Sequence, residues 1–125
     1  MRVALIANRA SGGGLDPAPL ARAMRERGAE VSVHGCEPGD LEAAAATGPD
    51  RLAVAGGDGT VGAVADLAGR LDVPLVVIPS GTANDFVRAN GLPLDPLEAA
   101  ALAVTGTELR HLELGRLGDG RPFVN

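Results

Sequence analysis

Three short apolar runs mark this 125-residue sequence, and each is continuous rather than alternating with polar residues. They cover residues 3–7, 52–55 and 75–78, and residues 31–33 form a weaker fourth run. An alternating strand keeps one face in water, whereas a continuous apolar run is typical of a parallel strand that is covered on both faces. The runs therefore predict the strands of a buried parallel sheet.

Apolar residues at helical spacing lie between these runs and predict four helices, over residues 17–27, 41–46, 60–71 and 95–105. We expect Asp40 to cap the second helix, and we expect Gly28 and Gly106 to mark the ends of the first and the fourth. Strands that alternate with helices form βαβ units with right-handed crossovers. The predicted fold is an α/β, three-layer open parallel sheet with helices on both faces.

The last twenty residues do not follow this alternation of strands and helices. Residues 108–114 resemble a strand, and the turn signal Gly118-Asp119-Gly120 leads into a further strand over residues 121–125. We expect the start of an antiparallel strand pair here, and we expect it to end unfinished.

The composition excludes several classes of protein. All 11 basic residues are arginine, so a Walker A loop, a protein kinase and a pyridoxal enzyme cannot be built, because each needs a lysine. Cys36 is the only cysteine, and His34 and His111 lie far apart, so we expect no disulfide and no protein metal site. The net charge of −5 argues against nucleic acid. Without a signal peptide or a membrane span in the sequence, we expect a cytoplasmic protein.

Glycine-rich segments follow the three strong runs, over residues 8–14, 56–62 and 80–85. The carboxyl ends of strands in an open α/β sheet line the ligand crevice, so these segments are expected to meet at one edge. In the middle segment, glycines let backbone N–H groups approach a phosphate, and the helix from Thr60 adds its positive end. Two alternatives stay open: a tight turn in which Asp58 or Thr60 only caps the helix, and a dinucleotide fingerprint over residues 57–62.

Asp58 is the best candidate for chemistry, because a carboxylate at a phosphate site can orient a hydroxyl, accept its proton or bind Mg²⁺. Thr82 can donate its hydroxyl to a phosphate or ribose, or it can cap a helix. Asn8 can reach the nucleotide or brace the glycines behind it, and Asn84 can bond the loop backbone. Cys36 and the two histidines are expected to be structural.

At these three segments the sequence resembles the catalytic domain of the diacylglycerol kinase family, which includes bacterial lipid kinases and the sphingosine and ceramide kinases. The stretch Gly-Gly-Asp-Gly-Thr over residues 56–60 is shared with NAD kinases and phosphofructokinase-like proteins. Gly-Thr-Ala-Asn-Asp-Phe over residues 81–86 is the more specific part and indicates a lipid kinase. Asn8 and the Ser-Gly-Gly-Gly of residues 11–14 agree in order and spacing, so the resemblance extends over essentially the whole chain.

The resemblance implies that residues 1–125 are a single nucleotide-binding catalytic domain of an ATP-dependent lipid kinase. Such an enzyme transfers the γ-phosphate of ATP, with Mg²⁺, to a lipid hydroxyl such as that of diacylglycerol. Asp58 would be catalytic. The residues expected to bind the nucleotide are Asn8, Gly56, Gly57, Asp58, Gly59, Thr60, Gly81, Thr82 and Asn84.

The expected partners are ATP and a lipid, with transient contact to a membrane surface, and a homodimer is left open. The β-rich second domain that shapes the lipid site in this family is expected to be absent. Gly62-Ala63 replaces the Asn-Glu that often follows in the family, and His34-Gly35-Cys36 stands where a threonine commonly contacts the nucleotide. An NAD-kinase-like phosphotransferase and a non-catalytic nucleotide-binding module remain as alternatives.

Overall fold

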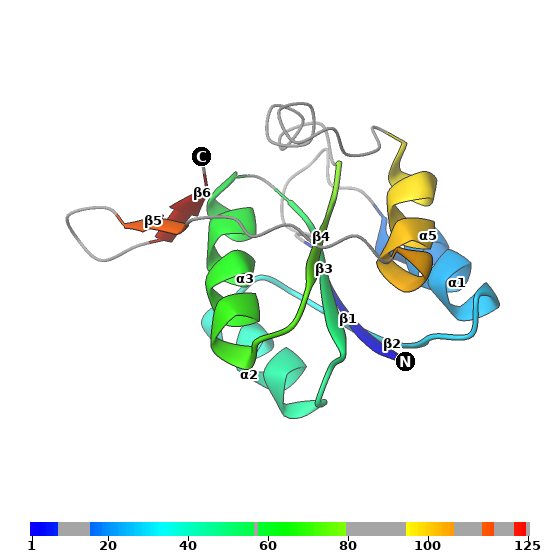
Figure 1. Cartoon of the computed structure of the whole chain (residues 1–125), viewed down its shortest axis with the longest axis horizontal. Coiled ribbons are helices and arrows are strands. Elements are labelled where there is room, and N and C mark those ends of the chain that lie inside the picture. The colour runs from blue at the N-terminus through cyan, green and yellow to red at the C-terminus, as the bar shows by residue number, and fades with distance from the viewer. Residues whose placement is uncertain (8–15, 57, 80–94, 107–113, 117–121, 125) are drawn as a thin grey trace.

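A computed structural model describes residues 1–7, 16–56, 58–79, 95–106, 114–116 and 122–124 (Figure 1). Four strands form one parallel sheet in the order β2-β1-β3-β4. Their bounds are β1 (Arg2–Ala7), β2 (Glu30–His34), β3 (Arg51–Ala55) and β4 (Leu75–Ile78). All four predicted strands are confirmed, including the weaker one.

Two layers of helices enclose the sheet (Figure 1). One layer holds α1 (Pro17–Glu26) and α5 (Pro96–Thr105), and the other holds α2 (Pro38–Ala46) and α3 (Asp58–Leu71). The predicted three-layer α/β fold is therefore confirmed.

Residues of β1 alternate between two apolar clusters, one on each face of the sheet. Val3 and Leu5 pack in the cluster beneath α1 and α5, whereas Ala4 and Ile6 pack in the cluster beneath α2 and α3. All four side chains are at most 1% exposed. Fully burying a side chain as large as Leu or Ile contributes about 1.5–3 kcal/mol to the stability of the fold, so packing on both faces of the sheet stabilises β1. This two-sided burial explains why the apolar runs are continuous.

The ends of α1 and α5 follow from local chemistry. The carboxylate of Asp16 accepts a hydrogen bond from the N–H of Ala18 at 3.0 Å, and Asp95 accepts one from Leu97 at 3.2 Å. In each helix a proline occupies the first position, where its missing N–H costs nothing. Gly28 ends α1 with a φ of +92°, a conformation that glycine adopts without strain.

The expected cap of the second helix was wrong. The helix α2 begins at Pro38 rather than at residue 41, and its N-cap is Glu37. Asp40 lies in the first turn, where its carboxylate accepts a hydrogen bond from the N–H of Glu37 at 3.1 Å. Proline fixes the φ that a first helical residue needs, so the helix starts at Pro38. From the first turn, the Asp40 side chain stabilises the N-cap by accepting the hydrogen bond from Glu37.

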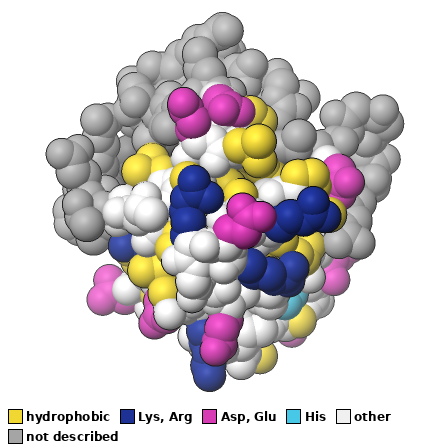
Figure 2. Space-filling view, turned by 90° about the vertical axis from the view of Figure 1, so that its right-hand side faces the viewer, with side chains coloured by type: hydrophobic (Ala, Val, Ile, Leu, Met, Phe, Trp, Pro, Cys, Tyr) yellow, Lys and Arg dark blue, Asp and Glu magenta, His cyan; other side chains and the backbone are white. Residues whose placement is uncertain are grey.

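The face that α1 and α5 cover carries charges of both signs. Exposed residues of α1 include Arg22, Arg25 and Glu26. Figure 2, which views the molecule from this side, shows arginine and acidic side chains next to one another among apolar ones. Over the described part of this face, the two signs are therefore interspersed.

A two-stranded antiparallel sheet ends the described chain. It pairs β5 (Leu114–Arg116) with β6 (Pro122–Val124), and β6 lies against α3. Of the strand expected over residues 108–114, only Leu114 falls within the described residues. In the part of the chain that the structure describes, no helix is long and apolar enough to cross a membrane.

Candidate nucleotide site

Three strands end level with one another at the edge where the glycine-rich segments begin. Ala7 of β1 pairs with Ala55 of β3, and Ala55 pairs in turn with Ile78 of β4. These residues are the last of their strands. The segments that begin at residues 8, 56 and 80 therefore depart from one edge of the sheet, the carboxyl edge, as the sequence predicts.

The junction between β3 and α3 is the described centre of this edge. Gly56 is buried, Gly59 is exposed and Thr60 is half-buried. Asp58 is the first residue of α3, which begins two residues earlier than expected. The first four N–H groups of a helix have no partner within the helix, and they carry the positive end of its dipole. The start of α3 therefore presents donors without partners within the helix at the carboxyl edge.

Gly56 and Thr60 are in close contact. A Cβ atom added to Gly56 would lie 3.0 Å from the Cβ of Thr60, 3.1 Å from its Cγ2 and 3.4 Å from its Oγ1. The side chain of Thr60 thus lies beside the Cα of Gly56, and a Cβ atom there would require Thr60 to shift by a few tenths of an ångström. Glycine is therefore favoured here for a packing reason that is independent of any ligand.

Cys36 lies in the turn between β2 and α2, and its side chain contacts Thr60 in the first turn of α3. It follows β2, and its side chain packs against the apolar cluster beneath α2 and α3. Burial raises the pKa of its thiol, a hydrogen bond with the side chain of Thr60 lowers it, and the carboxylates of Asp40 and Glu37 raise it further. The thiol is therefore held as the neutral form and is linked to the first turn of α3.

His34 and Asp40 are titratable residues near Cys36 whose interactions affect a pKa. Burial lowers the pKa of His34, and the nearby Asp40 carboxylate partly offsets that effect. A ring nitrogen of His34, Nε2, lies 2.8 Å from the hydroxyl oxygen of Ser32. A Cβ atom added to Gly35 would lie 2.6 Å from Oδ2 of Asp40, so a carboxylate occupies the space beside Gly35.

Of the nine residues expected to bind the nucleotide, the structure brings Gly56, Asp58, Gly59 and Thr60 together in one strand-to-helix junction. The other five lie outside the described residues; they are Asn8, Gly57, Gly81, Thr82 and Asn84. The strands that lead to Asn8 and to Gly81 end beside β3.

The contact between Cys36 and Thr60 is what the sequence analysis missed. The sequence suggested a structural role because a lone cysteine has no readable pattern. The sequence nevertheless places Cys36 at this edge, because it follows a predicted strand and lies where family members commonly have a threonine that contacts the nucleotide.

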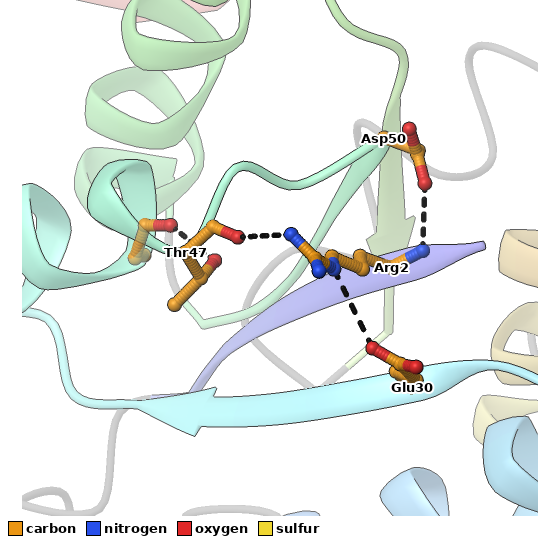
Figure 3. A network of polar contacts seen from close by, with 5 residues as sticks. Arg2, Glu30, Thr47 and Asp50 are labelled. Carbon is orange, nitrogen blue, oxygen red and sulfur yellow. Dashed lines mark hydrogen bonds and ion pairs between the residues drawn. The ribbon is translucent and has the colours of Figure 1, made fainter.

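The opposite, amino edge of the sheet carries a network of polar contacts (Figure 3). The backbone N–H of Arg2 donates a hydrogen bond to Asp50 at 2.7 Å, and its guanidinium donates one to the carbonyl of Thr47 at 3.4 Å and pairs with Glu30 at 3.4 Å. An open cavity of about 410 Å³ lies beside this network. It is lined by Arg2, Val3, Glu30, Val31, Ser32 and Thr47. Among the described residues, none that is expected to bind the nucleotide lines this cavity.

The described residues include no group of three or more His, Cys, Asp or Glu side chains that could hold a metal ion. A Mg²⁺ ion in a nucleotide site commonly uses one or two carboxylates together with phosphate oxygens and water, rather than a cage made by the protein. Asp58 at the start of α3 is a carboxylate residue at the right edge for that arrangement.

Comparisons with known proteins identify the family of this chain. The family model described as the diacylglycerol kinase catalytic domain matches residues 2–117. A protein of Pseudomonas aeruginosa PAO1 named lipid kinase YegS-like is 44% identical over 110 residues, covering 82% of this chain and 35% of its own length. The diacylglycerol kinase of Bacillus subtilis 168 is 34% identical over 134 residues, covering 99% and 44%.

Solved structures give the same result. A crystal structure of a diacylglycerol kinase from Bacillus anthracis Sterne matches with a TM-score of 0.63 and 29% identity, covering 85% of this chain and 44% of that one. Another structure from that organism reaches a TM-score of 0.71 at 28% identity, covering 99% and 48%. This chain thus spans less than half the length of these relatives. By its sequence and its fold, the chain belongs to the diacylglycerol kinase catalytic domain family.

Proposed function

We propose that this chain is the ATP-binding part of a lipid kinase that transfers the γ-phosphate of ATP to the hydroxyl of a lipid of the diacylglycerol type. The single observation that carries the proposal is the β3–α3 junction, where Gly56 leads into a helix whose first residue is Asp58. It lies at the carboxyl edge of a parallel sheet in a chain of the diacylglycerol kinase family.

Phosphate binding here needs no lysine. The N–H groups at the start of α3 are donors without partners in the helix, and the helix dipole favours an anion beside them. The exposed Gly59 in that first turn has nothing within 4 Å of where its Cβ would be, so a phosphate can approach the backbone closely. An arginine-only chain can therefore bind ATP through its backbone.

Asp58 is the residue proposed to act on the lipid hydroxyl. In the transfer, the hydroxyl oxygen bonds to the γ-phosphorus, the bond to the β-phosphate oxygen breaks and ADP leaves, and the hydroxyl proton is released. A carboxylate at this place can orient the hydroxyl and accept that proton, or it can bind Mg²⁺. When bound, Mg²⁺ neutralises charge on the phosphates.

Binding of ATP with Mg²⁺ to this chain tests the nucleotide site directly. A ligand that binds only the folded state stabilises it by RT ln(1 + [L]/Kd), about 2.7 kcal/mol at 100 times Kd. We expect a saturable rise in the melting temperature with ATP and a weaker one with AMP, which lacks the β- and γ-phosphates. No shift at millimolar ATP would contradict the nucleotide site.

Phosphate transfer to different acceptors tests the reaction. The chain is incubated with radiolabelled ATP and either diacylglycerol in mixed micelles or NAD, and the products are separated. Label in phosphatidic acid supports the lipid kinase, whereas label in NADP supports the NAD-kinase-like alternative. Saturable ATP binding with no transfer to either acceptor would favour a nucleotide-binding module without catalysis of its own.

A further inference from the structure

The side chain of Thr60 is turned toward the protein rather than away from it. Its Cβ, Cγ2 and Oγ1 all lie within 3.4 Å of the position that a Cβ atom on Gly56 would take. Thr60 also forms a hydrogen bond with the side chain of Cys36, and it is half-buried. The side chain of Thr60 therefore packs against Gly56 and forms a hydrogen bond with Cys36.

These neighbours belong to two different strand-to-helix turns. Gly56 follows β3 and leads into α3, whereas Cys36 follows β2 and leads into α2. The helices α2 and α3 contact each other on the same face of the sheet. Through its contacts with Gly56 and Cys36, Thr60 connects the β3–α3 turn to the β2–α2 turn at the carboxyl edge.

We propose that Thr60 is a positioning residue: together with Cys36 it fixes the first turn of α3, so that backbone N–H groups, and not the Thr60 hydroxyl, hold the nucleotide phosphate. This inference rests on the nucleotide site proposed above. In this proposal the Thr60 side chain positions the first turn of α3 instead of binding the nucleotide, and Cys36 has a role through its contact with Thr60.

The chemistry of α3 supports this division of roles. The helix begins at Asp58, so the N–H of Thr60 is among the first four, which have no partner within the helix. The side chain of Thr60 already has Cys36 and Gly56 as neighbours. The backbone N–H of Thr60, which has no partner within the helix, is therefore the group proposed to bind an anion, and a small rotation of the first turn would misdirect it.

The first experiment measures ATP·Mg²⁺ binding by calorimetry in Cys36→Ala, Thr60→Val and the double variant. One lost hydrogen bond corresponds to about a 3- to 10-fold change in Kd. We expect each single variant to weaken binding by about that factor, and the double variant to be no weaker than either, because both break the same link. Cys36→Ser, which keeps a hydrogen-bonding group, should restore binding to within about twofold.

The matched control is Thr47→Val. Thr47 is a half-buried threonine whose hydroxyl donates a hydrogen bond to the carbonyl of Ala44 at 2.7 Å, and it lines the cavity at the opposite edge. This substitution removes an equivalent hydroxyl without touching the proposed site, so ATP binding should not change. Urea unfolding of every variant separates a loss of binding from a loss of fold.

A second experiment follows the link without ATP. The rate at which iodoacetamide alkylates Cys36 is measured against pH in the wild type, Thr60→Val and Thr47→Val. Because the hydrogen bond with Thr60 lowers the pKa of the thiol, Thr60→Val should move the alkylation profile to higher pH, and Thr47→Val should not. An unchanged profile in Thr60→Val would overturn the link.

The outcomes separate this inference from the proposed function. If the wild-type chain does not bind ATP, the nucleotide site fails, whereas the alkylation profile still decides whether Thr60 and Cys36 are linked. If Thr60→Val weakens ATP binding and Cys36→Ala leaves it unchanged, the hydroxyl of Thr60 is a direct ligand and the positioning role is wrong.

Discussion

Thr60 occupies the space that a side chain on Gly56 would need, since the two Cβ positions would be 3.0 Å apart. Gly56→Ala therefore requires the Thr60 side chain, and with it the first turn of α3, to shift by a few tenths of an ångström. Overpacking of this kind costs about 1–3 kcal/mol, and we expect a loss of that size in the free energy of unfolding, measured with urea. A variant as stable as the wild type would show that Thr60 can move aside freely.

Gly59→Ala is the matched substitution three residues later. Nothing lies within 4 Å of the position that its Cβ would take, and the residue is in the first turn of α3. Alanine is favoured over glycine in a helix by about 0.5–1 kcal/mol, so we expect the fold to become slightly more stable. If phosphate lies against this turn, ATP binding should weaken although the fold is intact. Unchanged ATP binding would place the phosphate elsewhere.

Asp58→Asn tests the catalytic assignment in any form of the protein that transfers phosphate. The amide keeps the size of the carboxylate but cannot accept a proton. Loss of general base catalysis costs about 10²–10⁴ in rate, so we expect kcat to fall by at least about 10² while the Kd for ATP changes little. Steady-state kinetics and calorimetry give the two numbers. Equal effects on both would make Asp58 a binding residue.

His34 makes the folded state sensitive to mild acid. Its pKa is lowered by burial from an ordinary value of 6.5, so the unfolded chain takes up a proton at a pH where the folded chain does not. The unfolded state binds more protons, and stability therefore falls as the pH drops below about 6.5 toward the folded pKa. We expect wild type to lose more stability between pH 7.5 and 5.5 than His34→Gln does.

The urea unfolding of both proteins at the two pH values provides the test. The many carboxylates of the chain titrate in both proteins, so only the difference between them reports on His34. An identical pH dependence in the two proteins would show that His34 is not responsible.

At the amino edge, two acidic partners of Arg2 should differ in their contribution to stability. Asp50 accepts a hydrogen bond from the backbone N–H of Arg2 at 2.7 Å (Figure 3), and its removal leaves the start of β1 without that partner. We expect Asp50→Ala to cost about 1 kcal/mol. Glu30 pairs with the Arg2 guanidinium at 3.4 Å with both side chains more than 60% exposed, so Glu30→Gln should cost less than about 0.5 kcal/mol.

Thermal or urea unfolding of the two variants measures this difference. A larger loss for Glu30→Gln than for Asp50→Ala would mean that the surface ion pair, and not the backbone hydrogen bond, holds the amino edge together.

The sheet and its site edge could be predicted from the sequence because the signals are local. Continuous apolar runs such as residues 3–7 indicate burial on both faces, and Pro17, Asp95 and Gly28 act on the helix ends within a few residues. The level strand ends at Ala7, Ala55 and Ile78 confirm that the glycine-rich segments begin at one edge. The start of α2 was predicted wrongly, because the helix already begins at Pro38, with Glu37 as its N-cap, and Asp40 lies in its first turn.

By itself, the sequence determined the α/β order and the edge at which the glycine-rich segments begin, and it predicts a phosphate site without lysine, since each depends on residue type and short spacing. Only the tertiary structure decided that a side chain at residue 56 would crowd Thr60 and that Cys36 contacts Thr60. Residues 36 and 60 are 24 positions apart, and they meet because two parallel crossovers return their helices to one face of the sheet. Contacts of that kind have no local pattern, so they appear only when the chain is folded.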